Sequence, residues 1–142
     1  MPPFRLAAVL SLLAMTSACA QEPSCAFTGQ TIFPELEGAE AAFLAGDYAR
    51  FVGLAGAAMP QLDADALIAP LADAVPDGFA SCSTVLQRED VGGLVQELTV
   101  FSAPEGAGLV VLYMQSALID GSRRILQFSF DSDLNKMLAL LQ

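Results

Sequence analysis

Residues 109–130 read LVVLYMQSALIDGSRRILQFSF, and they contain the clearest structural signal of the chain. Asp120-Gly121 is a dipeptide typical of a two-residue type I′ turn, which joins two antiparallel strands. The residues on either side of it have the apolar content and the alternation of strands. We therefore predict a β-hairpin with strands at residues 109–118 and 122–130.

The two strands of this hairpin differ in their expected burial. The first strand contains an apolar run at residues 109–114 and should be central or covered on both faces. The second strand alternates in polarity. Its expected apolar face holds Leu126, Phe128 and Phe130, and its polar face holds Gln127 and Ser129.

Two further strands are predicted before the hairpin, at residues 81–88 and 94–102, each bounded by turn residues. Four strands in series with short turns predict an antiparallel meander. In the absence of bulges, one face of this sheet should contact helices. The opposite face is expected to be wet or to line a shallow cleft, and to carry the polar side chains Glu97, Thr99, Gln127 and Ser129.

The half of the chain before the strands has helical periodicity. Residues 35–45 are predicted to form a helix, and a second helix is expected from residue 48 to about residue 58. A third should start at the N-cap Asp63 and continue to about residue 75, with Pro70 kinking or splitting it. Asp131 or Ser132 could cap a last helix, whose apolar face is Leu134, Met137, Leu138 and Leu141.

These elements predict an α+β fold in one domain, residues 35–142. N-terminal helices would pack on a curved four-stranded antiparallel meander, and a short helix would end the chain. Residues 21–34 are rich in turn formers and are expected to form an arm ahead of this domain.

The first twenty residues have the order of an export signal. Arg5 supplies a positive start, residues 6–15 are apolar and uncharged, and residues 18–20 form a small-residue cleavage site. The apolar run is about half as long as a membrane-spanning helix. We predict a signal peptide at residues 1–20 and a periplasmic or secreted protein. Alternatively, Cys19 ends a loose lipobox, and its lipidation would anchor the protein in the envelope.

The chain has three cysteines. Either cleavage removes Cys19 from the pool that can pair, and an even pair in an oxidising compartment indicates a disulfide. A bond between Cys25 and Cys82 is therefore predicted, and it would pin the arm to the first strand.

Composition excludes several functions. Sixteen acidic residues face six basic ones, with a formal net charge of −10, which disfavours nucleic acid as a partner. Membrane contact is expected only through lipid on Cys19. The chain has no histidine and no nucleotide-binding or serine-hydrolase motif, so we predict no cofactor and no metal. Residues 131–135 match half of a calcium loop but lack its glycine and its last carboxylate, and a helix cap explains them better.

The segment from Phe43 to Phe51, FLAGDYARF, is similar to the helix, Gly-Asp turn and helix that open many small bacterial members of the nuclear transport factor two-like, or cystatin-like cone, superfamily. The resemblance covers roughly residues 35–130 and implies a sheet curved around a cleft. Enzymes of this superfamily often place an Asp and a His or Tyr in the mouth of the cone. Because this chain has no histidine, that chemistry would fall to Glu97 and Tyr113.

We therefore favour a non-enzymatic role, the binding of an apolar small molecule or a partner protein of the envelope in or beside the concave face. The expected ligand-binding residues are Glu97, Tyr113 and Gln127. One alternative is a small enzyme that uses a carboxylate and tyrosine pair. Another is an interaction module that dimerises through the sheet face around Gln127. Arg123-Arg124 could hold an anionic ligand, or could simply discourage edge pairing at a strand end.

Overall fold

The computed structural model describes residues 24–141. The predicted signal peptide and Cys19 lie outside these residues. The chain forms helices α1 (Pro34–Leu44), α2 (Tyr48–Ala55) and α3 (Ala64–Ala74), then strands β1 (Ser81–Glu89), β2 (Val95–Ser102), β3 (Leu109–Ile119) and β4 (Ser122–Asp131), and finally α4 (Leu134–Leu138). Two single 3-10 turns, η1 (Pro104–Gly106) and η2 (Ala139–Leu141), complete the order.

The four strands form one antiparallel sheet in the order β1-β2-β3-β4, as the sequence predicts. The β3–β4 hairpin turns at Asp120 and Gly121, which have φ values of 52° and 78°. Two positive φ values in succession are the signature of a type I′ turn. The predicted α+β meander with a short C-terminal helix is confirmed.

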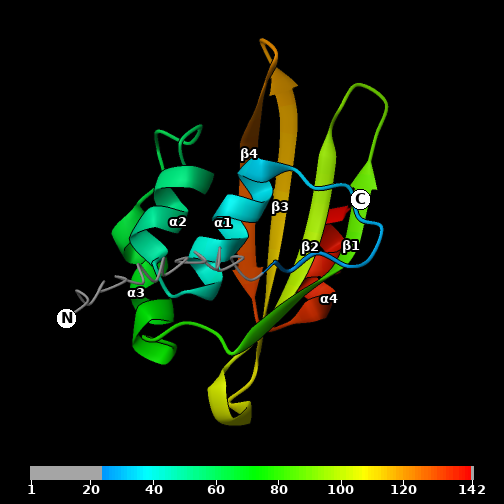
Figure 1. Cartoon of the computed structure of the whole chain (residues 1–142). Coiled ribbons are helices and arrows are strands. Elements are labelled where there is room, and N and C mark those ends of the chain that lie inside the picture. The colour runs from blue at the N-terminus through cyan, green and yellow to red at the C-terminus, as the bar shows by residue number, and fades with distance from the viewer. Residues whose placement is uncertain (1–23, 142) are drawn as a thin grey trace, which may run out of the picture.

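Helices lie on both faces of the sheet (Figure 1). On one face α1, α2 and α3 bury the larger core, and we call it the helical face. Phe43 of α1 is the centre of this core, with its ring centroid 4.9 Å from that of Phe51, 4.8 Å from that of Phe101 and 5.3 Å from that of Phe79. These contacts join two helices to the sheet.

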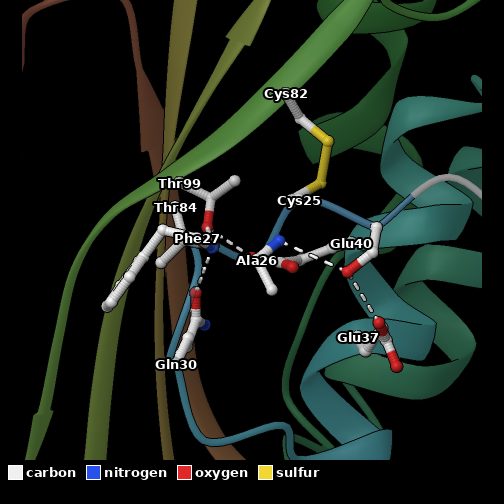
Figure 2. Close-up of a disulfide and its surroundings, with 10 residues drawn as sticks. Cys25, Ala26, Phe27, Gln30, Glu37, Glu40, Cys82, Thr84 and Thr99 are labelled. Carbon is white, nitrogen blue, oxygen red and sulfur yellow. Dashed lines mark hydrogen bonds between the residues drawn. A yellow bond between two sulfur atoms is a disulfide. The ribbon is translucent and has the colours of Figure 1, made fainter.

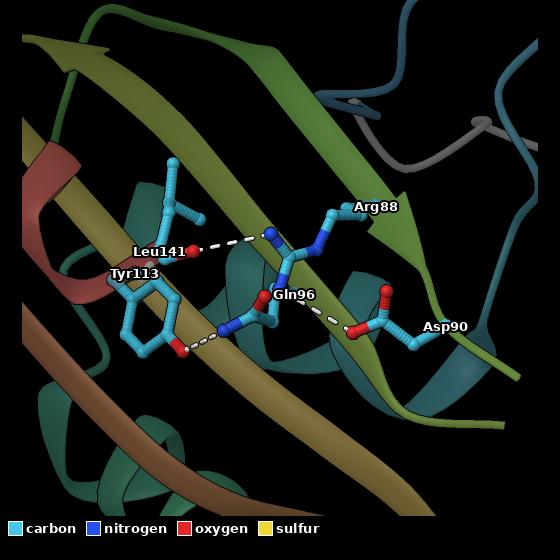
Figure 3. Close-up of polar contacts among 5 residues, drawn as sticks. All are labelled: Arg88, Asp90, Gln96, Tyr113 and Leu141. Carbon is cyan, nitrogen blue, oxygen red and sulfur yellow. Dashed lines mark hydrogen bonds and ion pairs between the residues drawn. The ribbon is translucent and has the colours of Figure 1, made fainter. Parts of the chain in front are cut away.

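The C-terminal segment covers the other face of the sheet. Met137 of α4 is buried there in a second, smaller core against Leu98, Val111 and Tyr113. The Arg88 guanidinium of β1 donates a 3.1 Å hydrogen bond to the carbonyl oxygen of Leu141 and so fixes the end of η2 (Figure 3). Both faces are therefore covered at the centre of the sheet, and residues 111–114 of β3 are buried as predicted.

The turn between α1 and α2 is built on a close contact between two glycines. Gly46 and Gly78 both have positive φ, 74° and 80°. A Cβ atom on Gly46 would lie 2.6 Å from the backbone nitrogen of Gly78. The Phe79 amide donates to the Leu44 carbonyl at 2.8 Å in the same place. This contact sets where the chain enters β1.

Pro70 does not split α3, contrary to one of the two outcomes that the sequence predicts. The helix runs from Ala64 to Ala74 with Pro70 inside it. Proline removes the amide that would bond the carbonyl of Ala66, and both residues lie on the exposed side of the helix. Water can therefore satisfy the freed carbonyl, and the helix continues.

The prediction that Glu97 and Thr99 lie on a wet face is wrong. Both are buried on the helical face. Glu97 pairs with Met114 of β3, and Met114 pairs with Phe128 of β4, so these three side chains lie on the same face of the sheet. Gln127 and Ser129 do lie on the other face. Bulges also break the simple alternation, between Thr84 and Leu86 in β1 and opposite Gln115 and Ser116 in β4. The second bulge leaves Leu126 exposed instead of in line with Phe128 and Phe130.

Candidate functional site

The most unusual group of side chains is a pair of buried carboxyl groups between α1 and β2. Glu40 of α1 is 3% exposed, and Glu97 of β2 is 2% exposed. Glu40 lies one turn after Leu36 and one turn before Phe43, so it falls on the face of α1 that packs on the sheet. We call Glu40 and Glu97 the carboxyl pair.

The N-terminal arm, residues 24–33, crosses β2 and β1 (Figure 1). The Gln30 side chain of the arm contacts Glu97 of the carboxyl pair. The disulfide between Cys25 and Cys82 holds the arm to β1, which confirms the predicted bond. The backbone amide of Thr84 donates to the Cys25 carbonyl at 2.7 Å. Figure 2 shows this disulfide, the arm and the polar side chains beneath it gathered in one place.

Each member of the carboxyl pair has a different set of partners. Glu97 Oε2 accepts hydrogen bonds from the side-chain amides of Gln30 at 2.9 Å and Gln87 at 2.7 Å. Glu40 Oε1 accepts from the Thr99 hydroxyl, which lies 3.1 Å from the hydroxyl of Thr84. In both bonds Glu97 is the acceptor, because side-chain amide nitrogens can only donate.

The electrostatics of the pair favour one proton on Glu40. Burial, repulsion by Glu97 and a side-chain hydrogen bond to it raise the pKa of Glu40 from 4.5 to about 9, against a smaller opposing effect of Thr99. Two carboxylates in contact away from water cannot both be ionised without a large cost. At neutral pH the protonated Glu40 can therefore donate to the Glu97 carboxylate.

Very little space adjoins the carboxyl pair. A cavity of about 10 Å³ is lined by Glu37, Glu40 and Glu97 together with Gln30 and Leu36. This volume is close to the minimum for a single water molecule. In this state the carboxyl pair is closed to any substrate.

The three residues predicted to bind a ligand do not form one site. Glu97 is on the helical face beneath the arm, whereas Tyr113 is buried on the other face beside Leu98. The Tyr113 hydroxyl accepts a 2.8 Å hydrogen bond from Gln96, whose own Oε1 has no partner within residues 24–141 (Figure 3). Gln127 is exposed on the same face as Tyr113. Ligand binding by these residues stays a prediction, but no cleft that they share is present in the described part of the chain.

A larger open space lies between the end of α2 and strand β4, and we call it the α2–β4 groove. Its volume is about 280 Å³. Its apolar lining consists of Leu54, Ala57, Ala58 and Ile125. Glu35, Arg123 and Arg124 supply the charged part of its wall.

Arg123 connects this groove to the start of α1. Its guanidinium lies 4.2 Å from the ring centre of Phe33, in cation–π contact. The same group donates to the Gly93 carbonyl at 3.1 Å and to the Ser116 hydroxyl at 3.0 Å. Arg123 is thus held in place, while Arg124 is exposed beside the groove.

Sequence reasoning missed Glu40, Gln30 and Gln87. A signal for Glu40 was present, since a glutamate within the apolar stripe of α1 must be buried or must interrupt the stripe. The two glutamines carried no such signal, because their roles depend on the path of the arm.

The acidic segment before α4 forms a helix cap. Asp133 accepts from the Asn135 amide at 2.9 Å, and Asp131 accepts from the Asp133 amide at 2.9 Å. Lys136 lies 3.2 Å from Asp131. Residues 24–141 contain no cluster of three or more His, Cys, Asp or Glu side chains that could hold a metal ion.

None of the helices in residues 24–141 is long and apolar enough to cross a membrane. No protein-family model matches the chain, and searches of curated proteins and of solved structures find no significant match. Membership of the nuclear transport factor two-like superfamily therefore stays a prediction.

Proposed function

We propose that this protein is an exported, non-enzymatic binding domain of the cell envelope. It would hold a small, largely apolar molecule with an anionic group in the α2–β4 groove. The observation that carries the proposal is the lining of that groove, where apolar side chains adjoin two arginines. Ligand sites are commonly concave and mostly apolar with a few polar groups that orient the ligand.

The charges at the groove favour an anionic end on the ligand. Arg123 and Arg124 come from adjacent positions of β4. Glu35 is the one acidic residue in the lining of the groove, so the positive charges outnumber the negative charge there. Arg123 is held by three contacts, so it loses little conformational freedom when it binds a carboxylate or a phosphate. The volume of about 280 Å³ lies near the lower end of ligand pockets and suits a small molecule.

The buried polar groups give less support to an enzyme. The carboxyl pair adjoins a cavity of about 10 Å³, and Glu97 is separated from Tyr113 by the sheet itself. A general acid or base must lie within hydrogen-bond reach of its substrate. A carboxylate and tyrosine pair that acts on one substrate would require the fold to open.

Dimerisation through the sheet is also less well supported. Strand β4 is an edge of the sheet, and Gln127 is exposed on it. The face on which Gln127 lies is, however, already covered at its centre by Met137 of α4, which packs there on Leu98, Val111 and Tyr113. Light scattering that showed a stable two-fold dimer would restore this alternative.

Binding can be tested with dansyl-labelled undecanoic acid as the probe. We expect saturable fluorescence enhancement with the purified protein. Leu54→Glu, which places a charge in the apolar lining, and Arg124→Gln should each weaken binding at least tenfold. Arg50→Gln is the control, because it removes an arginine of α2 that lies outside the groove and lines a separate cavity of about 390 Å³. A loss of binding in this variant alone would place the probe in that other cavity.

The methyl ester of the same probe separates the apolar and the anionic parts of the proposal. Weaker binding of the ester to wild type, with no further loss in Arg124→Gln, would support the anionic contact. Equal binding of acid and ester would contradict it. If the acid does not bind at all, or binds equally to wild type and Leu54→Glu, the groove is not the site.

Export rests on the predicted signal peptide and on the disulfide, which forms and persists in oxidising compartments. Alkylation of the intact protein in the periplasm should leave Cys25 and Cys82 unlabelled until a reductant is added. Mass spectrometry of the mature N-terminus then distinguishes release after Ala20 from lipidation of Cys19. Labelling without reductant would contradict an oxidising location.

A further inference from the structure

We propose that the arm is a proton-dependent latch. A single proton on the carboxyl pair keeps the arm closed, and loss of that proton lets residues 26–32 lift from β1 and β2. The proposal concerns the arm and does not depend on what the α2–β4 groove binds.

The arm is fixed at both ends and held by polar contacts between them. At one end is the disulfide between Cys25 and Cys82. At the other, Phe33 lies under the Arg123 guanidinium, and its carbonyl accepts from the Leu36 amide at 3.0 Å at the start of α1. The segment between these anchors can therefore open only as a loop, without leaving the molecule.

Two glutamine side chains join the middle of the arm to the carboxyl pair. Gln30 of the arm donates to Glu97 at 2.9 Å. Gln87 of β1 donates both to Glu97 at 2.7 Å and to the Thr31 carbonyl of the arm at 2.9 Å. Any movement of Glu97 is therefore transmitted directly to the arm.

Within residues 24–141, neither member of the carboxyl pair forms an ion pair with an arginine or a lysine. The elements packed around it contribute Glu37 and Glu40 from α1 and Glu97 from β2, while residues 24–33 contain no ionisable side chain apart from the bonded Cys25. From β1 the facing side chains are Thr84 and Gln87, which are uncharged. Within the described residues, the ion pairs of arginine and lysine are with Asp90 and Asp131, away from this site.

Ionisation of Glu40 removes the hydrogen bond within the pair and leaves two carboxylates in contact. Burial and the neighbouring Glu97 already hold the pKa of Glu40 at about 9. The proton leaves to solvent, and the repulsion is relieved when water reaches the two groups.

The arm is the element that can admit this water. Helix α1 and strand β2 are fixed by Leu36 and Phe101 in the core, whereas Phe27 and Ile32 of the arm are about half exposed, at 45% and 46%. The arm also has no helix or strand hydrogen bonds of its own beyond a turn at residues 27–30. Segments with few buried contacts open at the lowest cost.

Hydrogen exchange of the intact, oxidised protein tests the latch. The reporting amides are those of Phe27 and Gln30, which donate to Gln30 Oε1 and to the Phe27 carbonyl. After correction for intrinsic exchange, the opening equilibrium should rise by about tenfold per pH unit between pH 5.5 and 7.5, because opening releases one proton. Amides in the β2–β3 ladder exchange only when the whole domain unfolds, so they should stay more protected than the arm at every pH, and the difference in protection between the two sets reports the arm alone.

Glu40→Gln and Glu35→Gln provide the test and its control. The first variant keeps the shape of the side chain and donates an amide hydrogen to Glu97 at every pH, so the pH dependence of the arm should disappear. The second removes an exposed carboxylate from the same helix and should behave like wild type. Protection of the arm that does not change with pH in wild type, or that changes equally in Glu40→Gln, would overturn the proposal. If Glu40→Gln does not fold, the pH dependence of hydrogen exchange in the wild-type arm tests the proposal by itself.

Discussion

Glu40 is the residue whose chemistry departs most from its ordinary behaviour. A glutamine at this position can accept from Thr99 and donate to Glu97 without a proton to lose. We expect Glu40→Gln to raise the free energy of unfolding at pH 7 by up to about 3 kcal/mol, because the native state no longer has to keep a carboxyl group protonated. Urea unfolding measures this. Glu35→Gln, on the exposed side of α1, should change stability by less than about 0.5 kcal/mol.

A second prediction for single residues concerns the contact between Gly46 and Gly78. Replacing Gly29 by alanine places a side chain at a φ of 87° in open space, which should cost about 1 kcal/mol. Gly46→Ala combines a similar φ of 74° with a Cβ atom 2.6 Å from backbone. The loss of stability should therefore exceed that of Gly29→Ala by about 2 kcal/mol or more. Equal losses in thermal unfolding would show that the turn shifts freely.

At the scale of elements, α4 is the shortest α-helix and carries one large buried side chain. Met137 is 2% exposed in the second core, and truncation there should cost about 2–5 kcal/mol. Leu138, its neighbour on the helix, is 41% exposed, so Leu138→Ala is the matched control and should cost less than about 1 kcal/mol. Similar effects of the two substitutions on the unfolding midpoint would mean that α4 is not packed on the sheet.

The sequence predicted these elements well because each has a local cause. Asp120-Gly121 defines its hairpin through backbone conformation alone, and the helices begin close to Pro34 and Asp63 as expected. The faces of β2 were harder, because almost every residue of that strand is buried and polarity no longer marks the outside. Polarity alone therefore predicts the wet face for Glu97, whereas the arm and helix α1 together bury it.

The candidate sites could be predicted less well, because they depend on contacts between distant segments. The α2–β4 groove joins residues 35, 54, 57, 58 and 123–125, and no sequence pattern links these positions. The roles that the sequence predicts for Arg123-Arg124, an anion site or a charged strand end, stay predictions, and the contact of Arg123 with Phe33 could not be predicted. The disulfide was predictable since two cysteines remained after the signal segment was set aside.

For the molecule as a whole, the disulfide should be a major source of stability. It closes a separation of 57 residues, and in the chain-entropy model a loop of this length contributes about 4 kcal/mol. We expect the double variant Cys25→Ala, Cys82→Ala to lose stability of this order in urea unfolding. Reduction of the wild-type protein should give a similar loss. A change below about 1 kcal/mol in both cases would show that the arm is independent of the fold.

The pH dependence of global stability follows from the same carboxyl group that controls the arm. The unfolded chain loses the Glu40 proton near pH 4.5, whereas the native state keeps it until about pH 9. Between these values the native state binds more protons, so its stability is greatest on the acid side and decreases as the pH rises. The slope for one proton is at most about 1.4 kcal/mol per pH unit.

Asp131 has the opposite effect on the pH dependence of stability, because the Asp133 amide and Lys136 lower its pKa. This residue is at the surface, however, and solvent screens its contribution. Urea unfolding of wild type at pH 5.5, 7 and 8 should therefore show a falling unfolding free energy. Glu40→Gln should be flat over the same range, and the two curves should converge towards pH 5. A wild-type stability that is constant or rises from pH 5.5 to 8 would mean that water reaches Glu40 in the folded protein and that the carboxyl pair is not closed.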